Sequence, residues 1–400
     1  MKKPRDTFLS EIVAALSLMM DFSENRKLYH AWRVAILSEK LSQKLFPNYR
    51  TEMFYAGLLH DIGAISLPYH IVHYEKIEKP CKSSILFNHP QKSANIVKNL
   101  GFLFLASDII LDHHERWDGS GYPRGISGND ITLGGQILRI SDTVDVLLRD
   151  NFTSLGNIKK KLLLQRGKEF SDKIYEAMEV TLDENDFFDN IISEESISQI
   201  VLKIMKNLTP PNMVPFESEM DEIVKVFADV IDAKHNYTAG HSKRVAIYTY
   251  NIAKALGIPE EQAKKLKVAG YLHDAGKVAI PRAILDKPGR LTMDEYKLIK
   301  NHPVFTMEIM SMIHCLKDMV IIAGSHHERY DGMGYPGRLS RDTIPLGGRI
   351  MAIADAYDAM TSERPYQNKR NSVEAKDILI KNSRSQFDPE IVKVAVKVLS

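Results

Sequence analysis

The stretch AGYLHDAGK, residues 269–277, decides how this chain folds, because nearly the same stretch occurs earlier as AGLLHDIGA at residues 56–64. Both copies place a His-Asp pair after a run of small and apolar residues, with a glycine two residues after the aspartate. Only the later copy ends in a lysine, Lys277, where the earlier copy has Ala64. A repeated phrase of this kind indicates a repeated structural unit with a polar centre.

The similarity extends far beyond this stretch. A shift of 213 residues aligns 52–150 with 265–363 without a gap, and upstream the shift becomes 211. The matching segments are HAWRVAI and HSKRVAI, beginning at His30 and His241; HHERWDGSGYP (113–123) and HHERYDGMGYP (326–336); LGGQILRISD (133–142) and LGGRIMAIAD (346–355); and EFSDKI (169–174) and QFDPEI (386–391). We interpret this pattern as a tandem duplication.

Length, composition and net charge exclude several classes of protein. With 400 residues, 44% of them hydrophobic and 26% charged, the chain is typical of a globular protein with two or three domains. A net charge of +2 provides no strong field for a nucleic-acid polymer or an anionic membrane. No apolar run reaches the roughly 18 residues of a membrane span. The two cysteines, Cys81 and Cys315, are far apart, so we expect no disulfide framework and a cytoplasmic location.

Helical periodicity dominates the chain. Apolar residues recur at three- and four-residue steps in DEIVKVFADVIDA and HSKRVAIYTYNIAKALG, whereas DGMGYPGRLSRDTIPLGG reads as a long loop. The prolines of TPPNMVP (209–215) end any helix. The predicted fold class is therefore all-α, with two tandem helical bundles. We expect domains at 1–185 and 216–400, with a helical connector and a proline-rich linker at 186–215.

Each half carries seven residues that suit a metal centre. Imidazole nitrogens and carboxylate oxygens favour iron, manganese, zinc or nickel over calcium or magnesium. Seven such ligands with water suffice for two ions if one carboxylate bridges them, and Asp274 lies in the middle of the set. The candidates in the second half are His241, His273, Asp274, His302, His326, His327 and Asp355, and those in the first half are His30, His60, Asp61, His89, His113, His114 and Asp142.

The spacing of these residues has survived the duplication. From His241 to Asp355 the five main positions are separated by 32, 29, 24 and 29 residues, and from His30 to Asp142 by 30, 29, 24 and 29. A lone histidine is more often a surface or core residue than a ligand. The retained set, with both adjacent pairs, indicates a group that works as a unit.

These motifs resemble the HD-GYP family of phosphodiesterases. The resemblance rests on HxxR, HDxGK, NHP, HHExxDGxGYP and ADxYDAxTSxRPY, and it covers about residues 220–392 strongly and 10–180 more weakly. It implies a helical HD phosphohydrolase domain with a di-iron or di-manganese centre. It also implies hydrolysis of 3′,3′-cyclic dinucleotides, chiefly cyclic di-GMP, to the linear dinucleotide.

The resemblance also assigns roles to the candidate ligands. His241, His273, Asp274 and Asp355 would hold one metal, and Asp274, His302, His326 and His327 the other. Some members of the family hold a third metal through a carboxylate about one turn before the first histidine. Tyr237 stands at that position and Asp232 lies further back, so we expect two ions. Iron or manganese is favoured, with zinc or nickel as alternatives.

The expected chemistry is attack by a metal-activated hydroxide on a phosphodiester. Two metal ions can lower the pKa of a shared water and bind phosphodiester oxygens. Asp274 and Lys277 are the candidate catalytic residues, because a fixed cation near the phosphate stabilises the charge that grows in the transition state. Tyr335 of the Gly-Tyr-Pro loop is a candidate to pack on a base or ribose, although a plain Gly-Pro turn is the alternative.

Two further substrate contacts come from the resemblance. Arg364 matches the family's dinucleotide-binding arginine, and a guanidinium can grip phosphate or a guanine edge. Three residues on, many members carry Lys or Arg, whereas this chain has Gln367. That departure leaves cyclic GMP-AMP open beside cyclic di-GMP.

The first half keeps the ligands but lacks both cations. Ala64 replaces the lysine and Asn151 the arginine. We therefore expect a catalytically weak or inactive copy that is structural or regulatory and could still bind metal. We also expect the two repeats to pack as a pseudo-symmetric pair, with a homodimer as a further possibility.

Two other functions stay open at this point. One is a sensor or scaffold that binds a cyclic dinucleotide without turnover. The other is an HD hydrolase of a different phosphate ester, or a related di-iron oxygenase. Lys277 and the Gly-Tyr-Pro loop favour the phosphodiesterase.

Overall fold

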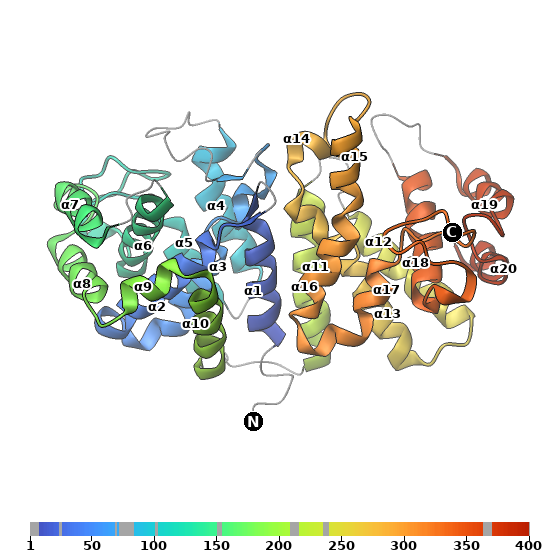
Figure 1. The fold of residues 1–400 in the computed structure, drawn as a ribbon, viewed down its shortest axis with the longest axis horizontal. Coiled ribbons are helices and arrows are strands. Elements are labelled where there is room, and N and C mark those ends of the chain that lie inside the picture. Colours follow the sequence, from blue (N-terminus) through green and yellow to red (C-terminus); the bar gives the residue numbers. More distant parts are fainter. Residues whose placement is uncertain are drawn as a thin grey trace. The chain divides into compact units, whose positions relative to one another are not determined.

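The structure is a computed structural model of the chain, which describes residues 8–23, 26–68, 70–71, 84–100, 103–149, 154–208, 216–234, 240–362 and 370–399. The chain divides into two compact units, Met1–Val214 and Pro215–Ser400. Both units are helical (Figure 1), and the expected all-α fold class is confirmed. Among the described residues, none of the helices combines the length and apolar character that a membrane crossing requires.

The first unit contains ten α-helices among its described residues. They are α1 (Phe8–Met20), α2 (His30–Leu45), α3 (Arg50–Leu59), α4 (Ile85–Lys98), α5 (Phe104–Leu111), α6 (Leu133–Arg149), α7 (Leu155–Gln165), α8 (Asp172–Leu182), α9 (Phe187–Ile192) and α10 (Glu194–Asn207). A small antiparallel pair joins β1 (Phe22–Ser23) to β2 (Arg26–Lys27), with Phe22 opposite Lys27. The segment expected to be a connector is thus largely helical, and α10 packs on α2.

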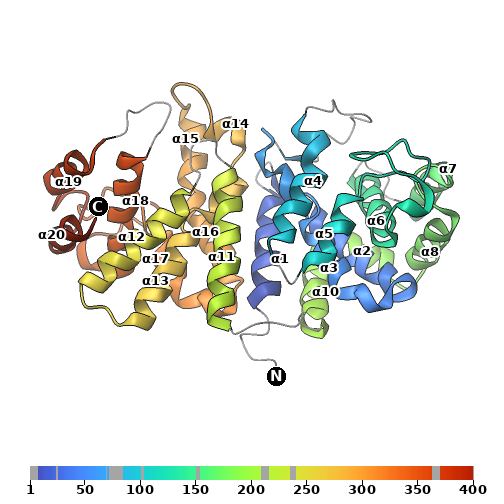
Figure 2. The same ribbon diagram turned by 180° about the vertical axis from the view of Figure 1, so that it is seen from behind.

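The second unit also contains ten α-helices among its described residues. They are α11 (Phe216–Ala233), α12 (His241–Ala255), α13 (Glu260–Leu272), α14 (Arg282–Leu285), α15 (Met293–Lys300), α16 (His302–Ser311), α17 (Val320–Gly324), α18 (Leu346–Thr361), α19 (Ser372–Lys381) and α20 (Pro389–Val398). By sequence shift, α12, α13 and α18 correspond to α2, α3 and α6. In both units these three helices form the centre of the bundle, because α12 packs on α13 and α18 just as α2 packs on α3 and α6 (Figure 2).

The start of α12 shows how local sequence positions a candidate ligand. His241 is the first residue of the helix, and Gly240 before it has a φ of 70°. The carboxylate of Asp232 accepts hydrogen bonds from the backbone N–H of Ser242 at 3.1 Å and from its hydroxyl at 2.6 Å. An anion that satisfies a free N–H at a helix N-terminus stabilises that end. Asp232 therefore anchors the turn that carries His241.

The glycine of the HDxG motif has a packing role. His273 and Asp274 lie between the end of α13 and a 3₁₀ turn, Ala275–Ala279. A Cβ at Gly276 would stand 2.0 Å from the carbonyl oxygen of His302, so only glycine lets this turn lie against the start of α16. Gly63 meets the carbonyl oxygen of His89 in the same way at 2.5 Å. The close contact fixes Asp274 beside His302.

Candidate metal centre

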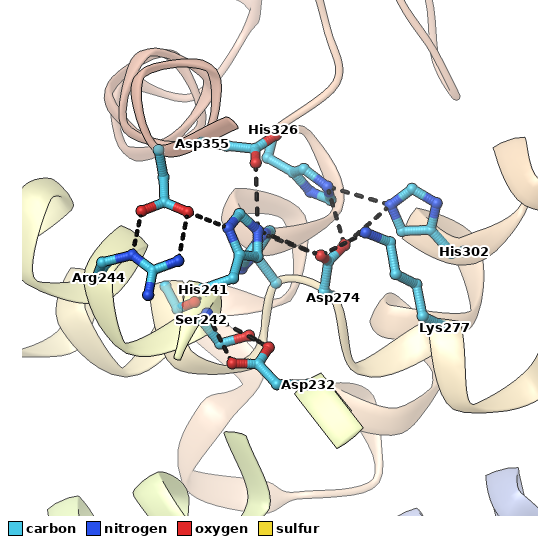
Figure 3. Close-up of polar contacts among 12 residues, drawn as sticks. Asp232, His241, Ser242, Arg244, Asp274, Lys277, His302, His326 and Asp355 are labelled. Atoms are coloured by element: carbon cyan, nitrogen blue, oxygen red, sulfur yellow. Dashed lines mark hydrogen bonds and ion pairs between the residues drawn. The ribbon is translucent and has the colours of Figure 1, made fainter. Parts of the chain in front are cut away.

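Asp274 lies at the centre of the histidines of the second unit (Figure 3). Its Oδ2 is 3.6 Å from Nε2 of His241 and 3.4 Å from Nε2 of His273. Its Oδ1 is 3.3 Å from Nε2 of His302 and 3.9 Å from Nε2 of His326. The two oxygens of one carboxylate thus face two different histidine pairs, which is the arrangement that a bridging ligand requires.

The remaining candidates complete two adjoining groups. Nε2 of His241 lies 3.4 Å from Oδ1 of Asp355, which α18 contributes. Nε2 of His302 lies 3.2 Å from Nε2 of His326. Within each group, potential ligand atoms lie no more than 4.8 Å apart; the groups are His241, His273 and Asp355, and His302, His326 and His327. All seven residues predicted from the sequence therefore converge on one place.

The histidines are held by the nitrogen that faces away from the centre. Nδ1 of His273, His302 and His326 donates to the backbone carbonyls of Gly270, Ile299 and Ala323 at 2.6–2.8 Å. A hydrogen bond at Nδ1 fixes the tautomer and leaves the lone pair of Nε2 directed inward, as metal-bound histidines require.

The His241 ring has a charged partner that the sequence analysis did not single out. Its Nδ1 donates to Oδ2 of Asp358 at 2.7 Å, and Nε of Arg244 donates to the other oxygen of Asp358 at 2.6 Å. Asp358 lies one turn beyond Asp355 on α18. Its counterpart Asp145 contacts His30 in the same way at 2.6 Å, so survival of this aspartate in both repeats was the signal that could have identified it.

Burial keeps two of the imidazoles neutral. It lowers the pKa of His302 to about 3 and that of His326 to about 4. Burial alone would raise the pKa of Asp274, but the charge of Lys277 and the neighbouring histidines hold that pKa well below its ordinary value. Neutral imidazoles around an ionised carboxylate form a donor set suited to a divalent transition metal.

Buried atoms without partners test whether a metal fits. Nε2 of His273 and Oδ1 of Asp274 are buried, and neither atom makes a hydrogen bond with the described residues. Buried polar atoms are nearly always satisfied in folded proteins, so such atoms require an explanation. Both point into the ligand cluster, and coordination to a metal would satisfy them. The residues present therefore fit the expected metal centre.

The first unit reproduces this geometry around Asp61. Oδ2 of Asp61 is 3.2 Å from Nε2 of both His30 and His60, and Oδ1 is 3.2 Å from Nε2 of His89 and 3.7 Å from Nε2 of His113. Oδ1 is also buried without a hydrogen bond among the described residues. The candidate groups are His30, His60 and Asp142, and Asp61, His89, His113 and His114.

Comparison with known proteins agrees with the duplicated cluster. The family model described as HD domain matches residues 15–157 and again 225–391, which together make up most of the chain. The chain belongs to the HD domain family. Each match contains one complete set of seven candidate ligands.

Two curated HD-domain relatives are named as phosphodiesterases. A 3′3′-cGAMP-specific phosphodiesterase 3 of Vibrio cholerae is 34% identical over 77% of this chain, and this chain spans 66% of that protein. A cyclic di-GMP phosphodiesterase response regulator of Xanthomonas campestris is 35% identical over 51% of this chain and 54% of its own length. The chain therefore spans less than two thirds of either relative.

A solved structure matches nearly the whole chain. It is a crystal structure of a cyclic GMP-AMP specific phosphodiesterase of V. cholerae, with 26% sequence identity and a TM-score of 0.67. The match covers 98% of this chain and 97% of the other. The likeness therefore extends over nearly the full length of both chains.

Lys277 lies beside the centre of the second HD unit. Its Nζ donates to Oδ2 of Asp274 at 2.6 Å, and its side chain is 22% exposed. Lys277 belongs to the 3₁₀ turn Ala275–Ala279, which follows the His273-Asp274 pair. The equivalent position in the first unit, Ala64, is buried.

The loop that contains Gly334-Tyr335-Pro336 packs against two of the candidate ligands, His302 and His327. The carboxylate of Glu328 accepts hydrogen bonds from the backbone N–H groups of Gly337 at 2.6 Å and Leu339 at 3.0 Å. The ring of Tyr335 stacks on His327, with 4.8 Å between ring centroids. Tyr335 thus packs on a candidate ligand, and its contact with a base or ribose stays a prediction.

Several expected positions lie outside the described residues. These are Arg364 and Gln367, the predicted substrate contacts, together with Tyr237 and Asn151. Their roles stay predictions.

Proposed function

We propose that the second unit is a metal-dependent phosphodiesterase that hydrolyses 3′,3′-cyclic dinucleotides to linear dinucleotides. The observation that carries this proposal is the position of Lys277, whose ammonium group touches the carboxylate shared by two histidine pairs. A cation at the edge of a two-metal ligand set is suited to a substrate that carries negative charge on phosphorus. The names of the relatives support the same reaction class.

The ligand geometry supports two ions that share Asp274. His241, His273 and Asp355 would complete one coordination sphere, and His302, His326 and His327 the other. When bound, a pair of divalent ions supplies Lewis acidity toward phosphoryl oxygens and lowers the pKa of a water at neutral pH. We favour iron or manganese because the set combines imidazole with carboxylate and contains no thiolate.

The chain's own residues would act mainly by position and charge. The carboxylates of Asp358 and Asp232 orient His241 before any substrate arrives, and the carbonyls behind the other histidines do the same. Lys277 is the preorganised cation for the charge that develops on non-bridging phosphoryl oxygens. Such a group stabilises the transition state more than the ground state, because the charge it faces grows along the reaction.

The preferred substrate that we propose is cyclic GMP-AMP, with cyclic di-GMP as a second substrate. The structure that matches nearly the whole chain is named for cyclic GMP-AMP. In addition, Gln367 stands where many relatives of the HD-GYP type carry a cation. A neutral amide there removes one partner for the second guanine.

The proposal is tested with full-length protein purified without oxygen. Metals per chain are measured, and cyclic GMP-AMP and cyclic di-GMP are assayed side by side. Asp274→Ala removes the shared ligand, so we expect loss of bound metal and a fall in kcat to the level of free metal. The matched control is Asp294→Ala, since the side chain of Asp294 is 94% exposed. Tight nucleotide binding by the unaltered protein without turnover would favour the sensor function instead.

We also propose that the first unit contributes little turnover. In the second unit Lys277 contacts Asp274, whereas the first unit has Ala64 at the equivalent position, so Asp61 lacks this cation. Loss of one such contact costs about 100- to 1,000-fold in rate. The expected packing of the two repeats against each other, and a homodimer, stay predictions.

A further inference from the structure

The two repeats differ at one buried pair of positions next to their metal ligands. A shift of 213 residues pairs Arg139 of the first unit with Ala352 of the second, and the aligned EFSDKI and QFDPEI segments pair Glu169 with Gln386. The first unit has therefore a cation and an anion where the second has a methyl group and an amide. Arg139 lies on α6, one turn before the candidate ligand Asp142.

The side chain of Arg139 points at another candidate ligand. Its Nη1 is 3.0 Å from Nδ1 of His114, and its side chain is only 16% exposed. Its Nη2 lies 3.3 Å from Oε1 of Glu169, which also accepts a hydrogen bond from Arg116. Its Nε is buried and makes no hydrogen bond with the described residues. The guanidinium is thus fixed between Glu169 and the histidine cluster.

This contact occupies His114. A guanidinium carries donors only and stays protonated, so Nδ1 of His114 must accept the hydrogen bond. A neutral imidazole that accepts at Nδ1 carries its proton on Nε2. Both nitrogens are then engaged, and neither offers a lone pair to a metal. At the equivalent position of the second unit, Ala352 ends at Cβ and offers no donor to His327.

Like the hydrogen bond, the positive charge of Arg139 disfavours metal binding at His114. A permanent positive charge in contact with His114 opposes a divalent cation at that ligand, and the low exposure of Arg139 limits screening by water. In the other ligand group the direct partner is an anion: the carboxylate of Asp145 lies 2.6 Å from Nδ1 of His30, and Arg33 and Arg149 also pair with that carboxylate. The two halves of the first cluster therefore differ in the charged group that contacts a candidate ligand, a guanidinium at His114 and a carboxylate at His30.

We propose that the first unit is a one-metal site, with the ion held by His30, His60, Asp61 and Asp142 and with Arg139 in place of the second ion. Its ligand is a single divalent transition metal. One ion cannot clamp both the attacking and the leaving oxygen of a phosphodiester, as two ions can. The site is therefore suited to hold metal rather than to hydrolyse. This inference does not depend on turnover in the second unit, so each can fail alone.

The test counts metal with the second centre removed. In full-length His241→Ala/Asp274→Ala/His302→Ala protein, loaded with Mn²⁺ and dialysed, we expect about one ion per chain. Adding Arg139→Ala/Glu169→Gln copies the second unit's residues into the first, and the count should rise to about two. Adding Asp61→Ala instead should bring it to zero. Electron paramagnetic resonance gives a second measure, because a coupled Mn²⁺ pair differs from an isolated ion.

The reverse exchange guards against loss of folding. In full-length Asp61→Ala protein, where only the second centre is intact, Ala352→Arg/Gln386→Glu should lower the count from about two to about one. Circular dichroism and thermal melts check that each variant is folded. Two ions bound with Arg139 in place, no ion bound at all, or counts unchanged by both exchanges would each overturn the proposal.

Discussion

At the scale of single residues, Lys277 is the clearest difference between the two HD units. Replacing it by alanine should lower kcat about 100- to 1,000-fold, because one preorganised contact to the transition state is lost. KM and metal content should change little, since the lysine contacts the ligand Asp274 without being a ligand itself. Steady-state kinetics with metal analysis check this expectation. Lys264→Ala, an exposed lysine on α13, is the control. Loss of metal in Lys277→Ala would instead show that the role of Lys277 is to position the ligand Asp274.

Lys234, the residue that directly follows α11, has a shifted pKa and therefore a pH-dependent effect on stability. Burial, with a smaller contribution from the charge of Arg282, lowers the pKa of Lys234 to about 8 from the ordinary 10.5. The folded state binds this proton less tightly than the unfolded state does. Below pH 8 both states are protonated and the full cost of charging the buried amine is present. The cost disappears as pH rises from about 8 to 10.5, so this residue makes the protein more stable with rising pH.

Lys234→Met should therefore stabilise the protein at pH 7 by up to about 3 kcal/mol, at 1.36 kcal/mol per pKa unit. The gain should vanish above about pH 10.5. Urea unfolding of the chelated protein at several pH values measures both effects. A stability difference between the variant and the parent that does not change with pH would show that Lys234 is not the titrating group.

The candidate ligands could be predicted at this scale because each is a polar residue retained at fixed spacing in both repeats. All fourteen lie where the two clusters form. The residues behind them were missed for a physical reason. Asp358 and Arg139 act through contacts with partners far away in sequence, and a spacing pattern does not show which side chains face one another.

At the scale of elements, helices α11 and α12 were predicted from their apolar periodicity, and the packing of α12 on α13 and α18 brings the ligands together. The Gly-Tyr-Pro loop was predicted only as irregular. Its shape depends on Glu328, whose buried carboxylate binds the backbone of residues 337 and 339. Composition identifies such a loop, but it does not reveal the side chain that organises it.

Gly334→Ala tests this loop as an element. A Cβ at Gly334 would lie 2.4 Å from the backbone nitrogen of Arg329 and 2.6 Å from Cα of Glu328, and backbone atoms cannot easily move away. We expect the free energy of unfolding to fall by about 2–4 kcal/mol and turnover to fall with it, because Tyr335 loses its place on His327. Urea unfolding and kinetics measure both. Met333→Ala, next to it and 79% exposed in the parent, should be neutral, and equal effects in the two variants would refute this explanation.

At the scale of the whole molecule, the duplication predicts an asymmetry between two equivalent aspartates. Each aspartate lies between histidine pairs, but Asp274 contacts Lys277 where the first unit has Ala64. In the first cluster Arg139 contacts His114 where the second unit has Ala352. Asp61→Ala should therefore remove metal from the first unit while turnover stays within about threefold of the parent. Asp274→Ala should remove turnover. The measurement is kcat with metals per chain for both variants, with the exposed Asp108→Ala on α5 as the control. Equal loss of turnover in both variants would contradict this prediction. The first unit would then either take part in catalysis or be required to keep the second unit in its active form. The thermal stability of Asp61→Ala would separate these two cases.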